Sequence, residues 1–142
     1  MLCNHDRDLV FAFYKKFGDV DVLMVEALSL LTGLQICKKH MAGNVLMEVD
    51  SNVLVQLVSS GLVARWSLVG TLQHIQALLN ELHASLDHIF RKANSLANAL
   101  AFARLERDLD FTSSEHMQIR VKYSTQLDKS LVPRLRRYCT RE

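Results

Sequence analysis

The stretch Val45-Leu-Met-Glu-Val-Asp50, followed directly by Ser51, decides the fold class of this 142-residue chain. It is short and mostly apolar, which predicts a β-strand that is covered on both faces. Ser51 is one of the residue types that cap helices, and the apolar residues after it share one helical face until Gly61. We therefore expect a strand that leads straight into a short helix.

A longer amphipathic helix is expected before this strand, from about Val22 to Met41. Asp19 or Asp21 caps its start, and Gly43 and Asn44 end it. Its apolar residues recur at three-residue spacing, and further residues widen the stripe: Val25, Leu28, Leu31, Leu34 and Cys37, then Ala27, Leu30 and Met41.

Strands and helices alternate along the remaining chain, which predicts an α/β domain with a mainly parallel sheet. The other expected elements are a strand over Leu9–Tyr14, a loop that holds Trp66, a helix marked by Leu72 to Leu82, a strand over Leu86–Phe90, and a helix that begins at Asn94 or Ser95 and carries Leu96 to Leu105. The residues expected in the core are Leu31, Leu34, Val49, Leu57, Ile75, Leu96 and Leu100.

The composition is that of a globular domain, with 49% hydrophobic and 23% charged residues. No apolar run approaches the roughly 18 residues that span a bilayer, and the N-terminal residues lack the pattern of a secretory signal. The three cysteines lie far apart, which favours a reducing compartment over a disulfide framework. We expect an intracellular protein of the nucleus or cytoplasm, neither secreted nor embedded in a membrane.

Residues 118–142 are basic, with seven Lys and Arg residues against Asp128 and Glu142. The rest of the chain is slightly acidic, and the formal net charge of the whole chain is +2. A basic tail on an acidic body holds phosphate backbones electrostatically, and it is also the composition of a solvated terminus. Both interpretations stay open.

Two carboxylates are candidates for a functional site. Asp50 ends the apolar strand, where open α/β sheets place their sites, and Glu26 lies early in the preceding helix. Packing of the helix on the strand would bring them together as oxygen ligands of a hard cation. The alternative is that Asp50 helps to cap the helix near Ser51 and that Glu26 is a solvated acid favoured by the helix dipole.

Three segments in register carry a resemblance to a known family. They are Glu26-Ala-Leu-Ser-Leu-Leu-Thr-Gly-Leu34, Glu48-Val-Asp-Ser51 and Arg91-Lys-Ala-Asn-Ser-Leu-Ala-Asn-Ala-Leu-Ala101. The first two resemble the pattern of type-1 ribonuclease H. The third is similar to the signature Arg-Glu-Ala-Asn-x-x-Ala-Asp-x-Leu-Ala of the plant branch related to retrotransposon reverse transcriptases. The resemblance covers about residues 2–105.

The resemblance implies a mixed sheet flanked by helices and the cleavage of RNA in RNA–DNA hybrids with Mg²⁺. It implies that Glu26 and Asp50 are metal ligands and that Asn98 stands where the signature has its final Asp. The implied domain spans residues 1–109, followed by a basic tail over 110–142. The implied partner is nucleic acid, either an RNA–DNA hybrid or a duplex.

The chain also departs from the family pattern. Asn98 is neutral, and the family's first strand, with its bridging Asp, is expected to be missing, so two of the four carboxylates remain. The strand at Val45–Asp50 would then lack a neighbour, unless Leu9–Tyr14 shifts into the gap or the chain is a fragment. We expect weak Mg²⁺ binding and an inactive, nucleic-acid-related domain. The alternative is a non-catalytic interaction or retroelement-remnant protein without a specific nucleic-acid role.

Overall fold

In the computed structural model, residues 2–3, 9–40, 44–61, 66–90 and 109–111 are described. Their helices and strands fall into two units. The first unit holds β1 (Leu2–Cys3), β2 (Leu9–Tyr14) and β5 (Leu109–Phe111). The second holds α1 (Val22–Lys39), β3 (Leu46–Val49), α2 (Asn52–Ser60), α3 (Trp66–Glu81) and β4 (Ser85–His88).

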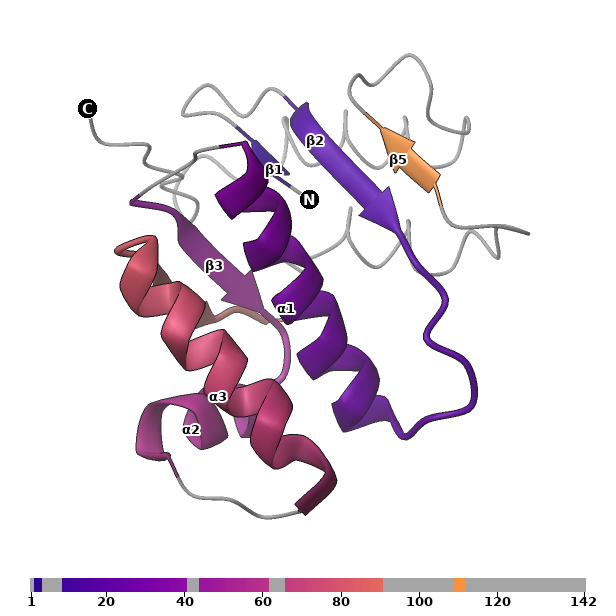
Figure 1. Ribbon diagram of the computed structural model, residues 1–142, viewed down its shortest axis with the longest axis vertical. Helices are drawn as coiled ribbons and strands as arrows, with labels where there is room; N and C mark the ends of the chain where they lie inside the picture. The colour runs from indigo at the N-terminus through magenta and orange to yellow at the C-terminus, as the bar shows by residue number, and fades with distance from the viewer. Residues whose placement is uncertain (1, 4–8, 41–43, 62–65, 91–108, 112–142) are drawn as a thin grey trace. The chain divides into compact units, whose positions relative to one another are not determined.

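The second unit is built on a parallel pair of strands. In the register of β3 and β4, Leu46 lies opposite Ser85 and Val49 opposite His88. Parallel strands need a long crossover connection, and α2 and α3 provide it. Figure 1 shows α1 and α3 side by side, both running in the direction opposite to β3. The starts of these two helices and the carboxyl end of β3 therefore point toward the same end of the unit.

Local sequence signals set the start of α1 and both ends of α2 as predicted, whereas α1 ends at Lys39 with His40 as its cap, earlier than the predicted end near Met41. The Asp21 side chain accepts a hydrogen bond from the Met24 amide at 3.1 Å, so Asp21 is the cap of α1. The Ser51 hydroxyl accepts one from the Leu54 amide at 3.4 Å and caps α2. Gly61 ends α2 with a φ of +66°, a left-handed conformation that glycine adopts without steric cost.

The buried stripe of α1 differs from the predicted three-residue spacing. Its buried residues are Ala27, Leu30, Leu34 and Cys37. Spacings of three and four residues keep side chains on one face of a helix with about 3.6 residues per turn, whereas a strict three-residue repeat drifts around it. Val25, Leu28 and Leu31 are accordingly only half-buried. On this side α1 contacts α3 and α2. The other buried apolar residues of the second unit are Val45, Leu54, Val58, Leu68, Leu72, Ile75 and Leu82.

The predicted core is confirmed at Leu34 and Ile75, both fully buried. The other predicted core residues within the described part, Leu31, Val49 and Leu57, are half-buried. Leu96 and Leu100 lie outside the described residues, as does the predicted helix that carries them.

The prediction of a loop at Trp66 is wrong, because Trp66 is the first residue of α3. Leu68 is buried and lies four residues before Leu72, on the same helical face. The helical repeat therefore starts one turn earlier than the predicted pattern. The predicted strand over Leu86–Phe90 is present as β4 but is displaced toward the N-terminus.

The first unit is antiparallel, with the strand order β1-β2-β5. The mainly parallel sheet predicted from the alternation is therefore wrong for these strands. Only residues 4–8 separate β1 from β2, which is too short for the crossover of about a dozen residues that parallel strands need. The Phe11 and Phe13 rings lie on β2 with their centroids 6.5 Å apart. Antiparallel and parallel pairs together make a mixed α/β fold.

The two helix-to-strand turns of the second unit meet each other. Asn44 precedes β3 and His83 precedes β4, and both have positive φ, +53° and +49°. The Asn44 amide donates a hydrogen bond to the Leu82 carbonyl at 2.9 Å. Nearby in sequence, the Lys38 ammonium and the Glu81 carboxylate form an ion pair at 2.9 Å. Both side chains are half exposed, so this pair stabilises the fold by at most about 1 kcal/mol.

Candidate carboxylate site

Asp50 lies directly after β3, at the carboxyl end of the parallel pair, and it is half-buried. The neighbouring Ser51, and not Asp50, has the side chain that caps α2. The Asp50 carboxylate is therefore positioned by the end of the strand, close to the start of a helix. Helix starts favour negative charge because their amide groups point outward.

Glu26 lies in the second turn of α1 and is half-buried. Asp21 is the cap of this helix, so Glu26 has no capping role. Because α1 and β3 run in opposite directions, the early part of α1 and the end of β3 lie toward the same end of the unit (Figure 1). That the two carboxylates lie close enough to share a cation stays a prediction.

The third predicted site residue, Asn98, lies outside the described residues. Within the described ranges, no three His, Cys, Asp or Glu side chains are grouped closely enough to hold a metal ion together. The described part of the candidate site therefore consists of two carboxylates, one on α1 and one directly after β3.

Glu48, on β3, has an unusual environment that the sequence prediction did not assign a role. Its Oε2 atom is buried and has no hydrogen-bond partner. A buried acceptor without a donor destabilises a fold by about 1–3 kcal/mol, and by more when it is charged. The signal in the sequence was an acid inside an otherwise apolar strand, Leu46-Met-Glu-Val49.

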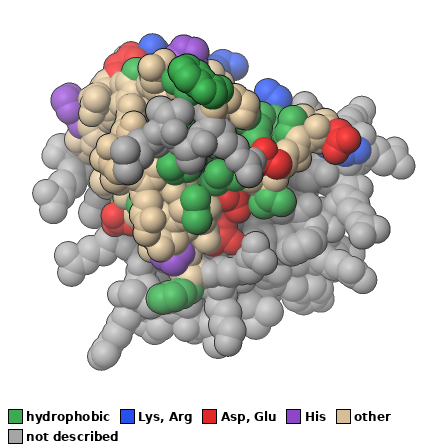
Figure 2. Space-filling model, turned by 90° about the horizontal axis from the view of Figure 1, so that it is seen from below, with side chains coloured by type: hydrophobic (Ala, Val, Ile, Leu, Met, Phe, Trp, Pro, Cys, Tyr) green, Lys and Arg blue, Asp and Glu red, His purple; other side chains and the backbone are tan. Residues whose placement is uncertain are grey.

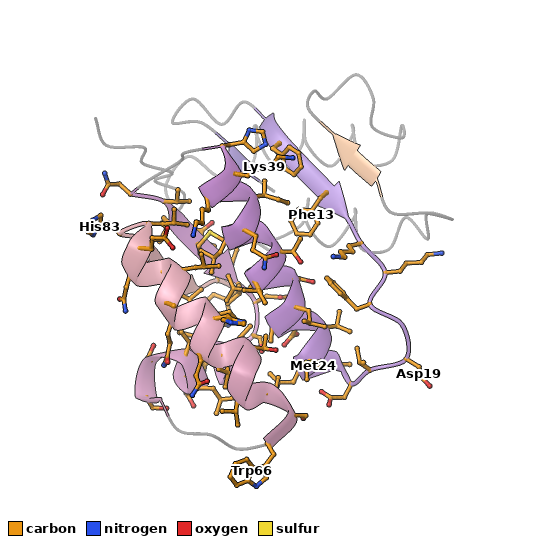
Figure 3. The ribbon with its side chains drawn as sticks, viewed as in Figure 1. Phe13, Asp19, Met24, Lys39, Trp66 and His83 are labelled. Atoms are coloured by element: carbon orange, nitrogen blue, oxygen red, sulfur yellow. The ribbon has the colours of Figure 1, made fainter. Side chains whose placement is uncertain are left out.

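The end of the unit that carries these acids also exposes apolar side chains. Figure 2 views the molecule from this end, and acidic side chains lie there among hydrophobic ones. Trp66 is 94% exposed, and Val22 and Val53 are 73% and 57% exposed. In Figure 3, Trp66 projects from the start of α3, at the opposite end of the helix from His83.

Cys37 is part of the core and has no chemical role in this arrangement. It is buried on the inner stripe of α1. Burial raises the pKa of its thiol above the ordinary value, because desolvation disfavours the thiolate. The raised pKa leaves less of the reactive thiolate at Cys37 than at an exposed cysteine at the same pH.

The mixed α/β fold, with three helices and a small parallel strand pair, is consistent with a ribonuclease H-like fold. The chain belongs to the reverse transcriptase-like family, the ribonuclease H-like domain of retrotransposon proteins, whose family model matches residues 1–103. This match confirms the resemblance to a ribonuclease H-like domain, whereas the plant branch stays a prediction. No curated protein matches the chain. None of the helices in the described part combines the length and apolarity that crossing a membrane requires.

Proposed function

We propose that this chain is a nucleic-acid-binding domain that does not hydrolyse the nucleic acid it binds. The observation that carries the proposal is membership of the reverse transcriptase-like family over residues 1–103. The basic residues of the C-terminal segment support it, because Lys and Arg bind phosphate backbones without regard to sequence. Such a protein works in the nucleus or the cytoplasm.

The ligand that we propose is an RNA–DNA hybrid or a related duplex. This finer proposal rests on the resemblance of the Glu26, Glu48-Val-Asp-Ser51 and Arg91–Ala101 segments to type-1 ribonuclease H. Hybrid and RNA duplexes share a wide, shallow minor groove and are recognised by shape and by 2′-hydroxyl contacts. Binding by the basic tail does not distinguish between duplexes. A preference for the hybrid over double-stranded DNA would therefore indicate that the folded domain contributes to binding.

The residues present do not fit the pair of Mg²⁺ ions that the resemblance implies. Mg²⁺ takes near-octahedral oxygen ligands and usually keeps several waters. Glu26 and Asp50 are suitable carboxylates, but the described residues contain no group of three ligands, and Asn98 is a neutral amide. We propose that this donor set holds at most one Mg²⁺ weakly, and that the chain does not cleave RNA.

Fluorescence anisotropy tests the binding proposal directly. The full chain is titrated into labelled RNA–DNA hybrid, double-stranded DNA and double-stranded RNA of equal length at several salt concentrations. We expect affinity to fall steeply with salt, by roughly tenfold or more between 50 and 200 mM, because each neutralised phosphate releases counterions. We also expect the hybrid to bind more tightly than double-stranded DNA.

Matched variants of the full chain separate the tail from the folded domain. Replacing Arg134, Arg136 and Arg137 by Gln should weaken binding to all duplexes about equally and flatten the salt dependence. Replacing Ser124, Thr125 and Gln126 by Ala changes as many tail residues without changing charge, and it should have no effect. Absence of binding to every duplex at low salt would contradict the proposal and favour a retroelement remnant without a nucleic-acid role.

A further inference from the structure

We draw no further inference here: the strongest candidate, the surface patch of exposed apolar side chains formed by Val22, Val53 and Trp66 at the starts of α1, α2 and α3, carries none, because nothing in the described part of the chain shows what covers it.

Discussion

The side-chain amide of Gln76 donates a hydrogen bond to the main-chain carbonyl of Val58 at 2.7 Å. Val58 lies in the last turn of α2, where carbonyl groups have no partner within the helix. Gln76, on α3, supplies the missing donor and so fixes how the two helices meet. A β-carbon added at Gly61 would lie 3.9 Å from the same Gln76 nitrogen, so the end of α2 and this side chain are in contact.

Replacing Gln76 with Ala should lower the free energy of unfolding by about 1 kcal/mol, because a partly buried carbonyl loses its donor. Gln73 lies on the same helix, is exposed, and is the matched control. Gln73→Ala should leave stability unchanged or raise it slightly, since Ala has the higher helix propensity. Urea denaturation of both variants measures the difference, and equal stabilities would show that the Gln76 hydrogen bond contributes nothing.

Leu34 is the best test of the packing of α1. Its side chain is fully buried, so Leu34→Ala should cost about 2–5 kcal/mol, the sum of lost transfer free energy and the cavity that remains. Leu28 lies on the same helix and is only half-buried, and Leu28→Ala should cost clearly less. Equal losses in thermal or urea denaturation would contradict the buried stripe through Ala27, Leu30 and Leu34.

The turn at His83 should prefer glycine to a β-branched residue. His83 has a φ of +49°, which is unfavourable for side chains with a β-carbon and most unfavourable for β-branched ones. We expect His83→Gly to be more stable than His83→Val by about 1–2 kcal/mol. His74 is exposed in the middle of α3 and is the control position. There the glycine variant should be no more stable than the valine variant, because glycine is the poorer helix former.

The thiol of Cys37 should react slowly in the folded chain. Burial raises its pKa, so at any given pH less of the reactive thiolate is present than in the unfolded chain. Timed alkylation with iodoacetamide, followed by mass spectrometry of the peptide that contains Cys37, measures the rate. The pH at which the alkylation rate begins to rise should be higher for the folded chain than for the chain unfolded in guanidinium chloride. Identical pH profiles in the two conditions would show that Cys37 is accessible.

Much of the second unit followed from short-range rules. Asp21, Ser51 and Gly61 act within one helical turn of their own positions, so their residue types were sufficient to predict helix ends. The start of α3 was missed because the repeat was traced back only to Leu72, although the buried Leu68 belongs to it. The pairing of β2 with β5 joins residues about a hundred positions apart, and nothing local to either strand specifies it.

The candidate site was predictable only in part. The order of strand and helix was enough to predict that the early part of α1 and the carboxyl end of β3 point toward the same end of the second unit (Figure 1). That Glu26 and Asp50 meet there stays a prediction. The environment of Glu48 was not predictable, because the burial of a single oxygen atom depends on every segment packed around it. The resemblance to ribonuclease H supplied the assignment of metal ligands, which the spacing of two acids does not establish.

Catalysis provides the sharpest test of the proposed function. Hydrolysis of an RNA–DNA hybrid by paired metal ions needs protein ligands for both ions. Glu26 and Asp50 are the carboxylates that the resemblance assigns, and Asn98 adds no charge. We expect no Mg²⁺-dependent cleavage of a labelled hybrid by the unmodified chain. Asn98→Asp alone should not restore cleavage, because Glu26, Asp50 and one added carboxylate are fewer than the four carboxylates that the resemblance implies.

The complementary experiment adds what the donor set lacks. A strand that bears an Asp, fused before residue 1 and combined with Asn98→Asp, should produce Mg²⁺-dependent cleavage if the missing ligands are the only obstacle. Asp50→Asn in that fusion is the control for contaminating nuclease, because Asn keeps the shape of the side chain and removes its charge. Cleavage by the unmodified chain that disappears in its Asp50→Asn variant would contradict the proposal. Such a result would mean that Asp50 belongs to a different set of metal ligands, one that functions with a neutral side chain at position 98.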